Sequence, residues 1–220
     1  MKHAKARKAV IELYQEVGRV GLILGSTGNV SLRTPEGMVI TPSGGTPGTV
    51  SARDLALITL DGEPAGRAGD DAPPSSEWPM HAEVYKGAPE AGCVIHTHAD
   101  AATALACLNQ PLPAFHYMVV QFGGTTVPCA PYVTFGTRDL ARLAGETIIG
   151  HSACLLANHG MIVHGRDATQ ALDRALLLEA LCRQYLLASA AGTPRLLTEE
   201  EMAAARERFR TYGRRRPDPA

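Results

Sequence analysis

Apolar residues near the start of the chain recur at the spacing of one helical face. Val10, Ile11, Leu13, Tyr14 and Val17 have Glu and Gln side chains between them and Lys and Arg before them, so residues 4–19 are predicted to form an amphipathic helix. Similar patterns and capping residues predict further helices from Ser75-Ser76-Glu77 to about Lys86, over about 100–108, 137–149 and 167–190, and from Thr198 to about Tyr212.

Short apolar runs between turn residues predict strands. One hairpin is expected over residues 30–41, and a second is expected to begin with 55–60 and to turn at Asp61-Gly62. Further strands are expected from Cys93 to the following histidines, over 154–157 and over 161–163. Helices and strands therefore mix. The predicted fold class is α/β, with residues 1–220 forming a single αβα layered domain whose central, largely antiparallel sheet is flanked by helices.

Composition narrows the choice of partners and compartment. The 220 residues are 45% hydrophobic and 20% charged, and the net charge of -1 provides no overall basic field, so neither nucleic acid nor a membrane is an expected partner. The five cysteines form no CxxC pair, and no apolar run reaches the roughly 20 residues of a membrane span. A cytoplasmic location is expected. The tail Arg214-Arg215-Arg216 is a local basic exception, either simply solvated or able to approach a phosphate.

Histidines follow two of the predicted strands. His96 and His98 are two positions apart, so their side chains lie on one face of a strand, and His159 stands where another apolar strand breaks into a glycine turn. Three imidazoles with an open position are typical of a catalytic zinc site, although a histidine at a strand end is also often a hydrogen-bonded structural residue. Glu77 is a candidate fourth ligand or base, or only a carboxylate placed favourably at a helix start.

The start His96-Thr97-His98-Ala99-Asp100 also resembles the HxHxDH pattern of metallo-β-lactamase-type hydrolases. That pattern requires a histidine after the aspartate, where this chain has Ala101. A two-metal hydrolase is therefore disfavoured.

Three loops each offer small side chains and hydroxyls: Thr27-Gly28-Asn29, Ser43-Gly44-Gly45 and Ser75-Ser76. Their backbone N–H groups suit a phosphate, particularly beside a helix N-terminus. Each loop alone is an ordinary turn, and none matches a Walker A or GxGxxG pattern, so a nucleotide is not indicated. Their occurrence together with the histidines favours a phosphorylated substrate.

Several motifs occur in the order found in one family. They are Thr27-Gly28-Asn29-Val30-Ser31, Thr41-Pro42-Ser43-Gly44, Ser75-Ser76-Glu77, His96-Thr97-His98, His116-Tyr117-Met118, Pro128-Cys129-Ala130-Pro131-Tyr132, Thr134-Phe135-Gly136-Thr137 and Asn158-His159-Gly160. With these motifs the chain resembles the class II aldolase/adducin family over nearly its whole length. The segment 116–137 is the most specific part.

The resemblance implies a role for each matching residue. It implies zinc (or Mn²⁺, Co²⁺ or Mg²⁺) on His96, His98 and His159, with Glu77 as a further ligand and catalytic acid/base. It implies a phosphate site formed by Thr27, Gly28, Asn29, Ser43, Gly44, Ser75 and Ser76. Tyr117 and Tyr212, which would otherwise be a core aromatic and the last apolar residue of a helix, resemble the catalytic tyrosines of the family.

The resemblance also implies an activity and an assembly. The expected reaction is cleavage of a ketose 1-phosphate, such as L-fuculose 1-phosphate, to dihydroxyacetone phosphate and a small aldehyde such as L-lactaldehyde. The expected assembly is a homotetramer with active sites shared between subunits. Sugar-phosphate dehydratases, decarboxylases and 4-epimerases of the same family remain alternatives, although the epimerases usually have Asp in place of Glu77. A non-catalytic adducin-like module is a further alternative, disfavoured because all three histidines are present.

Overall fold

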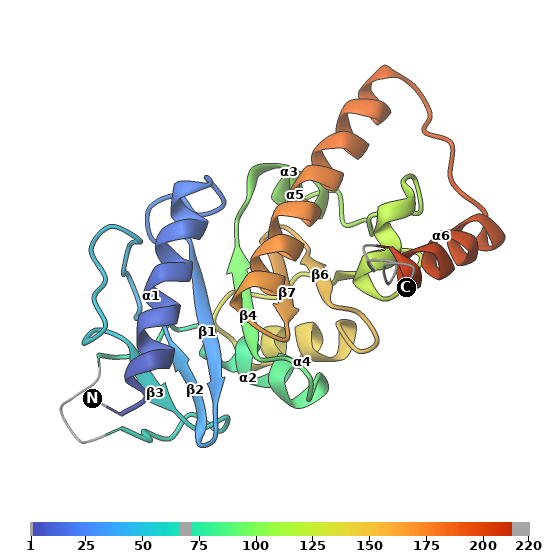
Figure 1. Cartoon of the computed structure of the whole chain (residues 1–220). Helices are drawn as coiled ribbons and strands as arrows, with labels where there is room; N and C mark the ends of the chain where they lie inside the picture. The colour runs from blue at the N-terminus through green and yellow to red at the C-terminus, as the bar shows by residue number, and fades with distance from the viewer. Residues whose placement is uncertain (1, 67–71, 213–220) are drawn as a thin grey trace, which may run out of the picture.

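The computed structural model describes residues 2–66 and 72–212 and places one seven-stranded sheet between two layers of helices (Figure 1). The tail Arg214-Arg215-Arg216 lies outside the described residues. The strands are β1 (Gly28–Thr34), β2 (Gly37–Ile40), β3 (Ala56–Ile58), β4 (Cys93–Thr97), β5 (Cys129–Ala130), β6 (Ala153–Leu156) and β7 (Gly160–Gly165). Their order is β3-β2-β1-β4-β7-β6-β5, and each pairing is antiparallel except β5 with β6.

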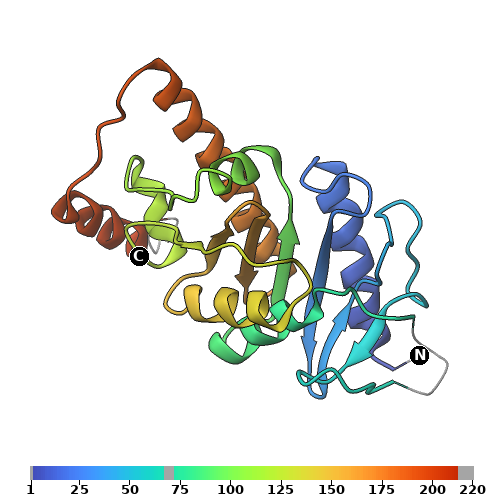
Figure 2. The ribbon, with the colours of Figure 1, turned by 180° about the vertical axis from the view of Figure 1, so that it is seen from behind.

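The helices divide between the two faces of the sheet. α1 (Ala4–Arg19), α3 (Asp100–Ala106) and α5 (Ala168–Ala191) cover one face, and α2 (Trp78–Gly87) and α4 (Arg138–Thr147) pack together on the other, which Figure 2 shows from behind. Side chains alternate across each strand. In β4, Cys93 and Ile95 join the core beneath α1, α3 and α5, while Val94 joins the core beneath α2 and α4. The predicted α/β class with helices on both faces is confirmed.

The last part of the chain extends beyond the sheet. α5 continues past the layer that it forms, and α6 (Glu199–Thr211) packs instead against η1 (Tyr117–Phe122), a 3₁₀ helix (Figure 1). Thr198 and Glu201 form the predicted capping box at the start of α6. Among the described residues, no helix combines the length and the apolarity needed to cross a membrane.

Two details of the predicted strands need correction. The second hairpin forms only in part: β3 pairs with β2, and among the described residues the segment after the Asp61-Gly62 turn meets β3 in a single isolated bridge, Ile58 with Pro64. Neither η1 nor β5 was predicted. β5 is two residues long, too short to show an alternating pattern.

Candidate active site

The strand register brings the three histidines together. His96 is in β4, His98 follows its end, and His159 precedes β7, the antiparallel neighbour of β4. Thr97 lies opposite Met161 in this pairing. A Cβ on Gly160 would lie 2.4 Å from the Thr97 carbonyl oxygen and 3.0 Å from His98 Cδ2, so the turn can come this close only with glycine. Histidines from distant segments therefore meet at one end of two paired strands.

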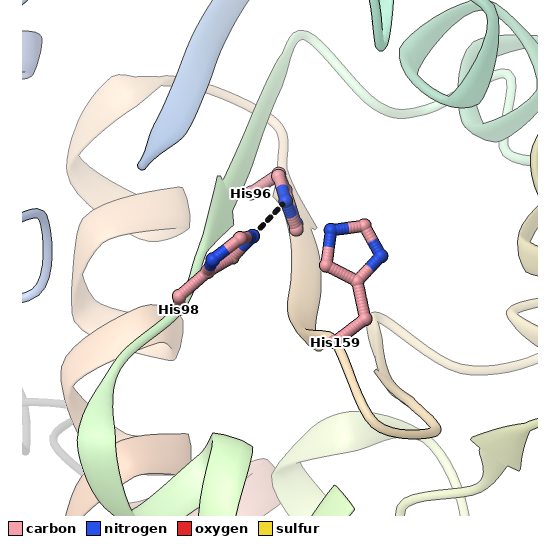
Figure 3. Close-up of side chains that lie close together, drawn as sticks. All are labelled: His96, His98 and His159. Carbon is pink, nitrogen blue, oxygen red and sulfur yellow. Dashed lines mark hydrogen bonds between the residues drawn. The ribbon is translucent and has the colours of Figure 1, made fainter. Parts of the chain in front are cut away.

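The three imidazoles surround a common point (Figure 3). Their ring centroids are 4.8–5.0 Å apart, and one ligand atom from each lies within 4.8 Å of the others. His96 Nδ1 is 2.8 Å from the Met161 carbonyl oxygen, which can only accept, so Nδ1 carries a proton and Nε2 is the atom that faces the other rings. Nε2 of His96 is 3.1 Å from Nε2 of His98.

Glu77, at the start of α2, contacts two of the three histidines. It is the N-cap residue of α2, and its carboxylate lies 3.2 Å from Nε2 of His96 through Oε2 and 3.2 Å from Nε2 of His159 through Oε1. Burial raises the pKa of the Glu77 carboxyl, but charge and hydrogen bonding from His96 and His159 outweigh burial and bring it well below its usual range. Glu77 is therefore an ionised carboxylate aimed at the histidines.

The donor set fits a divalent metal ion such as Zn²⁺. Burial first, and then the charges of its histidine neighbours, lower the pKa of His98 to about 4, so His98 is neutral at pH 7, the form that binds a metal. Apart from its 3.2 Å approach to Nε2 of His159, the buried Oε1 of Glu77 has no hydrogen-bond donor among the described residues, which suits a carboxylate oxygen that could bind a cation. Three histidines and one carboxylate would hold the ion.

A cavity of about 450 Å³ opens beside the cluster. Its lining includes Glu77, His98 and His159. It also includes every residue predicted to bind phosphate: Thr27, Gly28, Asn29, Ser43, Gly44, Ser75 and Ser76. Three loops that are distant in sequence thus face the same space as the candidate metal ligands.

Pairing between the loops explains this arrangement. Pro42 and Pro74 form an isolated antiparallel bridge, and the backbone N–H of Ser76 donates to Ser43 Oγ over 3.1 Å. Asn29 lies in β1 directly opposite His96 in β4. The α2 N-terminus lies at the same place, and the helix dipole favours an anion there.

Both candidate tyrosines lie away from this cavity. Tyr117 is half exposed in η1 and stacks on His116 and on Phe209 of α6, at centroid distances of 4.6 and 6.0 Å. Tyr212 is 74% exposed and packs edge-on against Phe209. The structure therefore does not bring either tyrosine to the histidines of its own chain.

The sequence-based interpretation missed two sets of residues. Tyr132, Val133 and Phe135 form a partly apolar wall of the cavity. His81, completely buried in α2, forms a hydrogen bond with Asn29. Its position four residues after Glu77, on the same helical face, was the signal that could have identified it.

Comparison with known proteins assigns this site to a family. The family model described as Class II Aldolase and Adducin N-terminal domain matches residues 8–186. The chain belongs to this family. An enzyme of Rhodospirillum rubrum named 5-methylthioribulose-1-phosphate/5-deoxyribulose-1-phosphate aldolase is 41% identical over 207 residues, covering 94% of this chain and 92% of the relative. The L-fuculose phosphate aldolase of Escherichia coli (strain K12) is 38% identical over 219 residues, covering 98% and 99%.

A solved structure agrees with this assignment. The structure titled L-fuculose 1-phosphate aldolase is similar to this chain with a TM-score of 0.89 and 33% identity, covering 96% of this chain and 98% of the other. The predicted membership of the class II aldolase/adducin family is confirmed. The prediction of an enzyme of the class II aldolase type, a lyase, is confirmed with it.

Proposed function

We propose that this class II aldolase uses a bound metal ion, zinc in the first place, to cleave a ketose 1-phosphate to dihydroxyacetone phosphate and a small aldehyde. One observation carries the proposal: the cluster of His98, His159 and Glu77 shares a cavity with three loops suited to a phosphate. A ketose 1-phosphate has its phosphate one carbon from the ketone, so both groups could be held in this space.

His96, His98 and His159, with Glu77, would hold the metal ion. When bound, the ion would act as a Lewis acid that stabilises negative charge on the substrate oxygens. Glu77 is ionised and within reach of the same place, so we assign it the transfer of a proton at the carbon that loses its bond. The phosphate loops would bind the substrate away from the reacting bond and so fix the reacting carbons in position.

The candidate substrates differ in the aldehyde portion. L-Fuculose 1-phosphate, the first expectation, would place a hydroxylated aldehyde against the wall of Tyr132, Val133 and Phe135. The relative from Rhodospirillum rubrum is named for substrates with an apolar end, which such a wall also accommodates. We therefore include 5-deoxyribulose 1-phosphate and 5-methylthioribulose 1-phosphate among the candidate substrates.

The distance of the tyrosines from the cavity supports a shared site. We propose a homotetramer in which Tyr117 faces the metal of a neighbouring subunit and removes the proton from the hydroxyl that becomes the aldehyde. Tyr212, exposed after the end of α6, is proposed to help close the same site. A cytoplasmic location is part of the proposal, since all five cysteines are free.

A coupled assay for dihydroxyacetone phosphate tests the reaction. The purified protein is offered L-fuculose 1-phosphate, 5-deoxyribulose 1-phosphate and 5-methylthioribulose 1-phosphate, and the aldehyde products are identified. Cleavage of at least one substrate should stop on exhaustive chelation, return with zinc and fall strongly in Glu77→Gln. Cleavage that survives both chelation and Glu77→Gln rejects the proposal. Loss of water, loss of CO₂ or epimerisation without cleavage would indicate a dehydratase, decarboxylase or epimerase instead.

A further inference from the structure

A row of buried polar side chains leads to Glu77 from the interior. Glu77, His81 and Tyr85 follow one another at four-residue spacing along one face of α2, and Asn29 and Ser31 share one face of β1. All five are at most 9% exposed. Hydrogen bonds join the two sets. The Tyr85 hydroxyl is 2.9 Å from the Ser31 hydroxyl, which is 2.7 Å from His81 Nδ1. His81 Nε2 is 2.5 Å from Asn29 Oδ1, and Asn29 Nδ2 is 3.0 Å from Glu77 Oε2.

The donor and the acceptor of each hydrogen bond in this row can be assigned. The Asn29 amide presents its NH₂ group to Glu77, with Nδ2 as the donor to Oε2, and its oxygen to Nε2 of His81. The amide oxygen only accepts, so His81 must carry a proton on Nε2. Burial first, and then the charge of His96, lower the pKa of His81 to about 3, so the ring is neutral and its Nδ1 accepts from the Ser31 hydroxyl. The Ser31 oxygen then accepts from Tyr85.

We propose that His81 is a positioning residue that holds the Asn29 amide in the one orientation that supports Glu77. If the amide turned over, its oxygen would face the Glu77 carboxylate, and two acceptors would repel each other in a buried site. The donor on His81 Nε2 excludes that orientation, because a donor cannot face the NH₂ group. Groups behind the ligands of a metal commonly set ligand orientation in this way. The inference rests on the proposed role of Glu77 as a metal ligand and proton carrier.

Two substitutions at His81 separate positioning from simple filling of the core. In His81→Gln, the amide nitrogen can reach the place of Nε2 and still donate to Asn29. In His81→Asn, the shorter side chain ends near the place of Nδ1 and leaves Asn29 Oδ1 without its donor. We expect His81→Gln to keep zinc affinity within about threefold of the original protein, and His81→Asn to lose on the order of 10–100-fold. Dihydroxyacetone phosphate release should follow the same order.

His164 provides the matched control. It is also a buried histidine, 2% exposed in β7, and its Nε2 contacts the His151 carbonyl oxygen at 3.1 Å. His164→Asn and His164→Gln should reduce the stability of the fold without changing zinc affinity. Zinc affinity is measured on the full metal-free chain by competition with a chelator, so the readout does not depend on which reaction the enzyme performs.

Three results would overturn the inference. They are an unchanged zinc affinity in folded His81→Asn, an equal loss in His81→Gln and His81→Asn, and nitrogen-15 NMR of the original protein that places the His81 proton on Nδ1. If His81→Asn does not fold, Ser31→Ala removes the donor that keeps Nδ1 an acceptor, and an unchanged zinc affinity there also rejects the inference. A protein that binds zinc as described but releases no dihydroxyacetone phosphate would reject the proposed reaction and leave the role of His81 standing.

Discussion

Asn29 and His96 lie directly opposite each other on the paired strands β1 and β4. This register places the loop before β1, a candidate for phosphate binding, beside the strand end that carries His96 and His98. On the other side of β4, pairing with β7 brings His159 to the same strand end. The site thus lies at one end of the neighbouring strands β1, β4 and β7, and Glu77 joins it from the start of α2.

Substitution of Gly160 should separate the end of β4 from the start of β7. In Gly160→Ala the new Cβ would lie 2.4 Å from the Thr97 carbonyl oxygen, so β4 and β7 must separate where the histidines meet. We expect a loss of roughly 1–3 kcal/mol in the free energy of unfolding, measured with urea, and a lower zinc affinity. Gly48→Ala is the control, because its Cβ would meet nothing within 4 Å. Equal stability of the two variants would contradict the close packing at Gly160.

The sequence alone predicted a large part of this site, for identifiable reasons. Alternation along a strand placed His96 and His98 on one face, and the segment Ser75-Ser76-Glu77 located the start of α2, although its N-cap residue is Glu77 and not the expected serine. The pairing of β4 with β1 and β7 could not be read from local patterns, because it joins segments more than sixty residues apart. His81 was missed for a similar reason: its importance depends on contact with Asn29, 52 positions away.

Glu179 is expected to stabilise the segment that follows His98. α3 has no side-chain cap of its own, and Glu179 of α5 accepts from the backbone N–H groups of Ala101 and Ala102, each at 2.8 Å. Free N–H groups at a helix start need such partners. Glu179→Ala should reduce the free energy of unfolding by about 0.5–2 kcal/mol, and Glu179→Gln, with one acceptor oxygen, by less. Urea unfolding checks this order. A larger loss in Glu179→Gln than in Glu179→Ala would contradict it.

The stability of the metal-free protein should depend on pH through His81. Burial lowers its folded pKa from 6.5 to about 3, whereas the unfolded chain binds the proton near 6.5. The unfolded state therefore gains a proton first, and the stability associated with neutral His81 is complete above pH 6.5 and is lost as the pH falls from 6.5 toward 3. His81→Gln lacks this titration. The free energy of unfolding of the original protein should therefore decrease relative to that of His81→Gln as the pH falls from 7.5 to 5. An unchanged difference in urea unfolding at the two pH values would contradict the prediction.

Zinc should raise the melting temperature of the metal-free protein. A ligand at 1,000 times its dissociation constant stabilises the folded state by about 4 kcal/mol, and each kcal/mol is worth about 2–4 °C in a chain of this length, so a rise of roughly 8–16 °C is expected. His98→Ala, which removes one of the three imidazoles, should lose most of this rise. His151→Ala is the control. His151 lies before the first residue of β6 and His159 after its last, so the two histidines are at opposite ends of this strand. The same rise in His98→Ala would exclude that histidine as a ligand.

Subunit exchange tests whether active sites are shared. Tyr117 is half exposed and stacked on Phe209, away from the cavity of its own chain, so its proposed role requires a neighbouring subunit. Tyr117→Phe and His98→Ala should each reduce cleavage at least tenfold, because one lacks the tyrosine hydroxyl and the other a metal ligand. If the proposed assembly forms, some sites in the mixed assemblies combine an intact Tyr117 from one chain with intact histidines from another. Dihydroxyacetone phosphate release should therefore recover in part after mixing. If exchange is confirmed by mass spectrometry and no activity returns, Tyr117 does not complete a site in a neighbouring subunit.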